Sequence, residues 1–194
     1  MFGTINLETY FDQITDQGWA IIDVDIQFAD ELRDRLNTLI LDDAFVMAGL
    51  ANSIFKISIR NDFISWINNE SDQVSEKKLF VHLNTLRRGL RDYFRMPLVD
   101  IEAHYAHYPK NHFYKKHTDQ SSIKNRRFFS FVIYLNTAWR AIDGGQICGY
   151  KNNLEIFNIN PDIGKMILFK SELEHEVLEC FTDRYSIAGW IRTA

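Results

Sequence analysis

The sequence contains little cysteine, proline and glycine. Among 194 residues there are two cysteines, three prolines and nine glycines. Two cysteines make no disulfide framework, and so few prolines and glycines leave no linker at which to divide the chain. No apolar run approaches the ~20 residues that span a bilayer, and the first residues lack the charged start and apolar middle of a signal peptide. We therefore expect a single domain over residues 1–194 that is cytoplasmic and has no membrane partner.

Basic residues are also fewer than acidic residues. The 22 lysines and arginines are outnumbered by 26 aspartates and glutamates, so the formal net charge is −4. A nucleic-acid-binding protein neutralises phosphates with a basic face, and this composition does not favour one. Nucleic acid is therefore not expected as a partner. Apolar residues, in contrast, are plentiful, because 46% of the chain is hydrophobic and 14% is aromatic, which is enough for one well-filled core.

The pattern of apolar residues divides the chain into a helical front and a β-rich back. Apolar residues three or four apart predict helices over residues 6–17, 28–41 and 76–95, and residues 19–24 resemble a strand. From residue 99 onward the pattern changes to short strand-like runs at 101–108, 128–135, 145–150, 154–159, 166–169, 177–180 and 185–191. Such a series of short strands predicts a β-sandwich or jelly roll, with helices covering one face of its major sheet.

Two histidines and an aspartate form the first candidate site. His117 and Asp119 occur as His-x-Asp, and residues two apart on an extended strand point to the same side. His175 comes much later, on a run that would lie beside the first in a jelly roll. Two imidazoles and one carboxylate with open coordination positions are the facial triad of non-haem Fe(II) oxygenases. Taken singly, however, the His-x-Asp also fits a polar surface turn, and His175 fits a structural histidine.

An arginine on the next predicted strand points to a co-substrate. Arg184 and Ser186 form the pattern Arg-x-Ser, which places both side chains on one strand face. A dicarboxylate bound to iron at one end needs its far carboxylate neutralised, and the planar fork of arginine does this with two parallel hydrogen bonds. The co-substrate predicted from this pattern is 2-oxoglutarate. Without the two histidines, Arg184 would be equally compatible with an ordinary surface arginine.

Further motifs surround these residues in an order and spacing that one family shares. They are Ile59–Ile67 (IRNDFISWI), Tyr108-Pro109, Tyr114-x-x-His-x-Asp119, Ile133–Asn136 with Trp139, Gly144-Gly145, and His175–Val177 with Arg184 and Trp190. The series resembles the 2-oxoglutarate/Fe(II)-dependent dioxygenases of the prolyl 4-hydroxylase type, similar to the hypoxia-inducible-factor prolyl hydroxylases and their bacterial relatives. The resemblance covers most of the chain. It implies a mainly β fold with α, a double-stranded β-helix (jelly roll, cupin-like) in residues 98–194, with N-terminal helices packed on the major sheet and a finger loop within residues 1–97.

The resemblance also implies an iron site and a co-substrate pocket. The positions that match the family's Fe(II) ligands, and would hold its iron-oxo oxidant, are His117, Asp119 and His175. The positions that match or complete its 2-oxoglutarate pocket are Arg184, Tyr134, Tyr108, Ser186 and Trp190. Dioxygen is then the second co-substrate, with ascorbate as a candidate reductant. The tyrosines and the tryptophan are also compatible with plain core packing.

Four more positions match residues near the family's active-site mouth. Arg60, Asp62 and Trp66 match a charged and aromatic cluster at the end of a mobile loop, which predicts that residues 44–62 close over the substrate as a finger. Arg127 matches an arginine near the mouth and is expected to face the substrate backbone. A surface salt bridge without such a role is the alternative. At residues 110–113 and 120–125 the chain departs from the family's glycine-rich turns, which leaves the identity of the substrate open.

The resulting hypothesis is a dioxygenase, monomeric or weakly dimeric, that hydroxylates a prolyl residue of a partner protein or peptide and forms succinate and carbon dioxide. Two alternatives stay open. A hydroxylase of a free amino acid or another small molecule would use the same ligands. A jelly-roll sensor could bind metal and ligand without turnover, because function depends on the site and not on the fold.

Overall fold

The computed structural model describes residues 7–48, 59–120 and 126–194. The elements in this part of the chain are α1 (Glu8–Gln17), β1 (Trp19–Asp23), α2 (Ile26–Leu41), β2 (Val46–Met47), β3 (Phe63–Trp66), α3 (Val74–Phe94), β4 (Leu98–Tyr108), β5 (Tyr114–His117), β6 (Arg127–Tyr134), the short 3-10 helix η2 (Ala141–Asp143), β7 (Ile147–Lys151), β8 (Leu154–Ile159), β9 (Lys165–Lys170), β10 (Glu174–Val177) and β11 (Arg184–Thr193). The three predicted helices are confirmed with small shifts of their ends.

Local sequence signals set the ends of these helices. α1 ends at Gly18, whose φ of 91° lies in the left-handed region that glycine adopts without strain. α2 begins after Asp25, whose side chain accepts a hydrogen bond of 2.9 Å from the backbone N–H of Phe28. α3 ends at Arg95, which is itself left-handed and precedes Pro97 by two residues. No helix within the described residues is long and apolar enough to cross a membrane.

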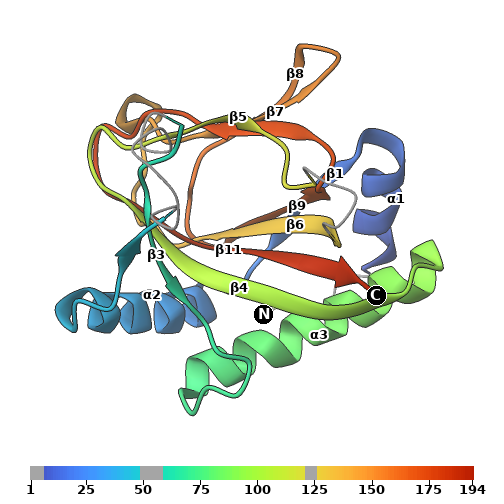
Figure 1. Cartoon of the computed structure of the whole chain (residues 1–194), viewed down its shortest axis with the longest axis horizontal. Coiled ribbons are helices and arrows are strands. Elements are labelled where there is room, and N and C mark those ends of the chain that lie inside the picture. The colour runs from blue at the N-terminus through green and yellow to red at the C-terminus, as the bar shows by residue number, and fades with distance from the viewer. Residues whose placement is uncertain (1–6, 49–58, 121–125) are drawn as a thin grey trace.

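The strands form two antiparallel sheets that lie one above the other (Figure 1). The large sheet has the strand order β1-β9-β6-β11-β4-β3-β2, and the small sheet has the order β5-β10-β7-β8. Helices α2 and α3 lie on the side of the large sheet that faces away from the small sheet. This is the predicted jelly roll with N-terminal helices packed on its major sheet.

Alternation along the strands of the large sheet separates a helix-facing core from the space between the sheets. On β6, Phe129, Phe131 and Ile133 belong to the core cluster that includes the apolar faces of all three helices. Val132 and Tyr134, which alternate with them, pack instead with apolar residues of β7, β8 and β9. Because successive side chains of a strand point to opposite faces, one strand supplies both layers. The candidate site lies in the second layer.

One predicted strand is wrong. The run at 177–180 is not a strand of its own, because β10 spans Glu174–Val177 and ends where that run was expected to begin. In β10 the side chains of His175 and Val177 are buried, whereas Glu174 is exposed and Glu176 is half-buried. Alternation of apolar residues failed to identify this strand because one of its two inward positions is a histidine.

Two edge strands were not predicted. β2 and β3 pair with each other, and β3 pairs with β4, so the two strands extend the large sheet at one edge. β2 falls within the range 44–62 that was expected to form a finger, so this part of the range is sheet and not loop. Residues 49–58, the centre of the expected finger, lie outside the described residues. Both cysteines, Cys148 and Cys180, are buried as free thiols.

Candidate metal and co-substrate site

The three candidate metal ligands lie together beside the small sheet. His117 is the last residue of β5, and His175 of β10 is its direct register partner. Asp119 lies in the bend after β5 and not in the strand. The prediction that His117 and Asp119 point to the same side of one strand therefore does not explain the position of Asp119. The backbone N–H of Asp119 donates to the carbonyl of Ser171 over 3.1 Å, which holds the bend in place. One ligand atom from each of the three side chains lies within 4.8 Å of the others.

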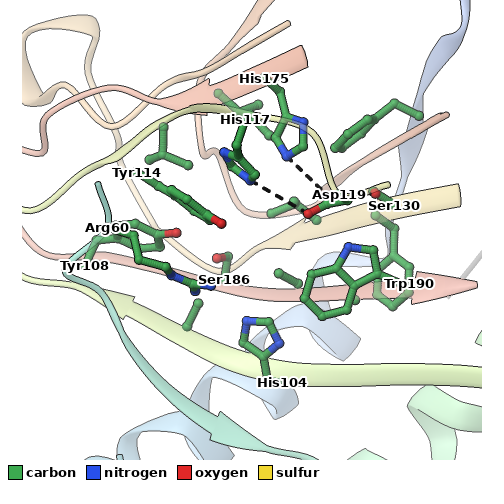
Figure 2. A pocket seen from close by; sticks show the side chains of 18 of the residues that line it. Arg60, His104, Tyr108, Tyr114, His117, Asp119, Ser130, His175, Ser186 and Trp190 are labelled. Carbon is green, nitrogen blue, oxygen red and sulfur yellow. Dashed lines mark hydrogen bonds and ion pairs between the residues drawn. The ribbon is translucent and has the colours of Figure 1, made fainter. Parts of the chain in front are cut away.

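Each histidine is oriented by a backbone carbonyl. Nδ1 of His117 lies 2.8 Å from the carbonyl oxygen of Lys115, and Nδ1 of His175 lies 2.9 Å from that of Leu173. A carbonyl oxygen only accepts, so both Nδ1 atoms donate and carry the proton. The Nε2 atoms are then directed at the carboxylate of Asp119, at 3.7 and 3.5 Å, along the dashed lines in Figure 2.

The electrostatics of these side chains suit a divalent cation. Burial, and after it the charge of His175, lower the pKa of His117 to about 4, so His117 is neutral near pH 7. Burial alone would raise the pKa of Asp119, but His175 and a hydrogen bond of 2.7 Å from the hydroxyl of Ser130 outweigh burial and lower it. The site therefore offers imidazole lone pairs and an ionised carboxylate, which is the protonation state that metal binding requires.

The candidate co-substrate arginine is buried. Arg184, the first residue of β11, is 1% exposed. Its Nε donates to the carbonyl of Gly145 over 2.9 Å, and its Nη1 donates to the hydroxyl of Ser186 over 3.0 Å. Both acceptors are neutral, and within the described part of the chain no carboxylate pairs with this guanidinium. A buried cation without an anion is unfavourable, so the position suits an anionic ligand.

Two tyrosines flank this arginine. The guanidinium carbon of Arg184 lies 5.0 Å from the ring centre of Tyr108 and 5.6 Å from that of Tyr134. Burial raises the pKa of both hydroxyls, which therefore stay protonated and can donate. The hydroxyl of Tyr134 is buried and has no hydrogen-bond partner among the described residues. A carboxylate bound here would give Arg184 a counter-ion and Tyr134 an acceptor.

One cavity between the sheets joins the metal ligands to Arg184. Its wall includes the three candidate ligands and most of the predicted co-substrate residues: Arg184, Tyr108, Ser186 and Trp190. Tyr134 is not part of that wall and belongs to the apolar core between the sheets. Figure 2 shows the ligands on one side of the cavity and Ser186 and Trp190 on the other.

Three of the predicted substrate residues are Arg60, Asp62 and Trp66, and only Arg60 belongs to the cavity wall. The guanidinium of Arg60 lies 4.4 Å from the ring centre of Tyr114. Nε and Nη2 of Arg60 each donate to the carboxylate of Asp62 over 2.7 Å. Asp62 is completely buried and Trp66 is largely exposed, and neither belongs to the cavity wall.

The fourth predicted substrate residue does not face the cavity. Arg127 donates to the carboxylate of Glu102 over 2.8 Å, and its guanidinium carbon lies 3.5 Å from the ring centre of Trp190. It is therefore placed to hold the indole of Trp190 from outside the cavity wall. Arg127 is not among the residues of the cavity wall, and the expectation that it faces a substrate backbone stays a prediction.

Three residues of the site were not predicted from the sequence. Ser130 orients the carboxylate of Asp119, and Tyr114 stacks on His117 with ring centres 3.5 Å apart. His104 lines the cavity opposite the ligands. Alternation on β6 and β4 could have identified Ser130 and His104, because they occupy the same strand faces as other cavity residues. Tyr114 stands in a quoted motif, but no pattern indicated its stacking.

Comparisons with known proteins agree with this geometry. Residues 103–192 match the family model described as the 2OG-Fe(II) oxygenase superfamily, a range that contains the three candidate ligands and Arg184. A prolyl-4-hydroxylase from Pseudomonas putida is 27% identical with a TM-score of 0.88, over 97% of this chain and 99% of that chain. A prolyl hydroxylase from Trichoplax adhaerens, in complex with a hypoxia-inducible-factor oxygen degradation domain peptide fragment, is 23% identical with a TM-score of 0.81, over 95% and 88% of the two chains.

A third solved structure supports the same fold. A prolyl 4-hydroxylase from Phytophthora capsici is 22% identical with a TM-score of 0.79, over 96% of this chain and 62% of that chain. The chain thus matches the 2OG-Fe(II) oxygenase family model over residues 103–192, and its fold is similar to that of the prolyl-4-hydroxylase from Pseudomonas putida.

Proposed function

We propose that the protein is an Fe(II)- and 2-oxoglutarate-dependent dioxygenase that hydroxylates a prolyl residue of a protein or peptide and forms succinate and carbon dioxide. The observation that carries the proposal is the buried guanidinium of Arg184, which has no carboxylate partner among the described residues and shares a cavity with His117, Asp119 and His175. A ligand with a carboxylate at its far end and metal-binding oxygens at its near end fits this cavity. 2-Oxoglutarate has that chemistry.

In this proposal His117, Asp119 and His175 hold the metal. Fe(II) bound there would supply the open coordination positions at which 2-oxoglutarate and dioxygen react. The chain's own contribution is the support of the ligands. The carbonyls of Lys115 and Leu173 fix the imidazole tautomers, because each accepts from Nδ1 and leaves Nε2 free to bind a metal.

Arg184, Ser186 and Tyr134 would bind the far carboxylate. The hydroxyl of Ser186 accepts from Nη1 of Arg184, so its own proton is available to a ligand. The hydroxyl of Tyr134, which has no partner among the described residues, would supply another donor from behind the cavity wall, and Tyr108 closes the same end of the cavity. Charge-assisted hydrogen bonds of this kind are shorter and stronger than neutral ones.

The remainder of the wall excludes water from the reacting groups. Val177, Ile147 and Phe169 contribute apolar surface, and Trp190 contributes its indole. Arg127 stabilises that indole from outside by stacking on it. A dry cavity strengthens the electrostatic contacts of the ligand and prevents side reactions.

The prolyl target is the finer part of the proposal. The similarity to the Pseudomonas putida prolyl-4-hydroxylase supports it, as do the exposed Trp66 and the cavity-lining Arg60 near the site. We assign Arg60 a direct contact with the substrate, with Asp62 holding its guanidinium in place through two hydrogen bonds.

The decisive experiment uses the purified protein reconstituted anaerobically with Fe(II) and then supplied with 2-oxoglutarate and air. Succinate formation and the mass gain of one oxygen atom are measured with a library of proline-containing peptides and, separately, with free proline. Oxygen gain on peptides supports the proposal. Gain only on free amino acids favours the small-molecule hydroxylase, and binding of 2-oxoglutarate without succinate under any condition favours the sensor.

A further inference from the structure

His104 lies on the cavity face of β4, away from the arginine end. Inward-facing residues of β4 stand opposite inward-facing residues of β11 in successive register pairs. From the arginine end these pairs are Tyr108 with Arg184, Ala106 with Ser186, and His104 with Ala188. His104 therefore lies beyond the residues that would bind the far carboxylate, and Figure 2 shows it across the cavity from the metal ligands and beside Trp190. A substrate bound beside the co-substrate would therefore lie in this part of the cavity.

The Nδ1 atom of the buried His104 has no hydrogen bond to any of the described residues. The residue is 3% exposed and lines the cavity, and its Nδ1 atom is buried with no partner among the described residues. Its ring centre lies 4.9 Å from that of Trp66 and 5.4 Å from that of Trp190. An unpaired polar atom in such a place is unfavourable, and an apolar ring would pack between the two indoles without this penalty. Because His104 also lines the cavity, its unpaired nitrogen is a candidate contact for a ligand bound there.

The character of that ligand follows from the charges around the imidazole. Burial lowers the pKa of His104 to about 4, so the ring is neutral near pH 7 and offers one donor and one acceptor. A free amino acid would need counter-charges for its ammonium and carboxylate groups. The nearby arginines already pair with carboxylates, Arg60 with Asp62 and Arg127 with Glu102. An uncharged amide matches the neutral imidazole better.

We propose that His104 is a substrate-recognition residue whose imidazole hydrogen-bonds to a backbone amide of the substrate next to the target ring, which favours peptides over free amino acids. The proposal rests on the proposed function, because it places the substrate between the metal ligands and β4. It also explains why a polar residue stands between Trp66 and Trp190, which could otherwise enclose an apolar ring on their own.

Two substitutions separate hydrogen bonding from packing. His104→Phe keeps an aromatic ring between the two indoles and removes both nitrogens, whereas His104→Asn keeps an amide near the position of Nδ1. The probe is a library of pentapeptides with a central proline, acetylated and amidated at the ends, added anaerobically to protein loaded with Mn(II) and 2-oxoglutarate. Binding is measured by the change in tryptophan fluorescence, and binding of 2-oxoglutarate by calorimetry.

We expect His104→Phe to bind the library at least about tenfold more weakly than the wild type, and His104→Asn to recover part of that loss. The affinity for 2-oxoglutarate should stay within about twofold in both variants, because His104 lies beyond the carboxylate-binding end. Free proline should bind the wild type more weakly than the library does.

The proposal is overturned if His104→Phe binds the library as tightly as the wild type does. It is also overturned if the wild type prefers free proline to the library, a result that leaves the dioxygenase function standing. The proposed function fails separately. A wild type that binds 2-oxoglutarate and the library but makes no succinate in air would refute catalysis, while the comparison of the three proteins would still decide the role of His104.

Discussion

His117 and His175 face each other across the β5–β10 pair, with their ring centres 4.3 Å apart and both Nε2 atoms directed at one carboxylate. The facing positions are set by strand register, and the tautomers are set by two backbone carbonyls. Neither contact involves a metal. The chain therefore preorganises its candidate ligands, and the loss of one ligand should affect metal binding far more than folding.

Asp119→Ala should abolish metal-dependent stabilisation. A ligand that binds only the folded state at about 100 times its dissociation constant stabilises a protein by about 2.7 kcal/mol. We expect added Mn(II) to raise the melting temperature of the wild type and to leave that of Asp119→Ala unchanged, because this substitution removes the ionised carboxylate of the site. Succinate formation should be lost as well.

Lys115→Ala is the matched control for that substitution. Lys115 is exposed, and its hydrogen bond with His117 uses its backbone carbonyl, which alanine retains. This variant should show the same Mn(II)-dependent shift as the wild type. A shift of normal size in Asp119→Ala would refute the assignment of the ligands.

The sequence could predict that the candidate ligands lie together, because their positions depend on the backbone. His117 and His175 meet through strand register, which short-range patterns and family motifs both constrain. The helices were predictable for a similar reason, since their buried residues recur at helical spacing. The strand that carries His175 was harder to locate, because glutamates flank the histidine and hide the alternation.

Other features could not be predicted because they depend on side-chain conformation or on the assembly of the sheet. Arg127 has a long side chain that turns to Glu102 and Trp190, and no pattern in the sequence specifies that choice. The short strand β3, next to the edge of the large sheet, pairs with β4 beyond the whole of α3, so its existence depends on the completed sheet. His104 can be recognised as a site residue only from the structure, because the signal is an Nδ1 atom with no partner among the described residues.

Arg184→Lys should weaken 2-oxoglutarate binding. Lysine keeps the charge but loses the planar fork, the bond to Gly145 and the bond to Ser186. A hydrogen bond to a charged group contributes about 1.5–3 kcal/mol, so we expect the dissociation constant for 2-oxoglutarate to rise by about 10- to 100-fold in calorimetry with Mn(II)-loaded protein.

Arg192→Lys provides the comparison for this effect. Arg192 lies near the other end of β11, where it pairs with Asp100 and Glu102 outside the cavity wall. Its substitution should leave 2-oxoglutarate affinity within about twofold of the wild type. Equal losses in the two variants would mean that β11 is disturbed generally, and the role assigned to Arg184 would be wrong.

Gly145→Ala should also impair 2-oxoglutarate binding, although it removes no polar group. Gly145 has a φ of 67°, and a methyl group on it would lie 3.1 Å from Cδ of Arg184 and 2.9 Å from Sγ of Cys180. The guanidinium would have to shift, and its hydrogen bond to the Gly145 carbonyl would be disturbed. We expect the Michaelis constant for 2-oxoglutarate to rise, together with a loss of stability of about 1–3 kcal/mol.

Gly164→Ala separates backbone strain from the effect on Arg184. Gly164 has a φ of 83°, and a methyl group there would meet a flexible side chain, Ile26, at 3.0 Å. This substitution should cost a similar amount of stability in urea unfolding and leave the Michaelis constant for 2-oxoglutarate unchanged. If both variants raised that constant alike, strain alone would account for the effect.

His104 should make the metal-free protein less stable as the pH falls. Burial, the largest cause, lowers its pKa to about 4 in the folded state, whereas the ordinary value is 6.5. Between these values the unfolded chain binds a proton that the folded chain does not, so stability decreases as the pH falls through this window and is fully present above it. A shift of this size corresponds to about 3 kcal/mol at most.

His104→Phe removes this contribution, and urea unfolding of the metal-free proteins from about pH 8 to about pH 4.5 measures it. His117 also has a pKa lowered to about 4 and titrates in both proteins, so the difference between the two stability curves isolates His104. We expect His104→Phe to gain stability relative to the wild type as the pH falls below 6.5, with a constant difference above about pH 7.5. Parallel curves over the whole range would show that the imidazole is not held neutral, and the match to an uncharged amide would lose its basis.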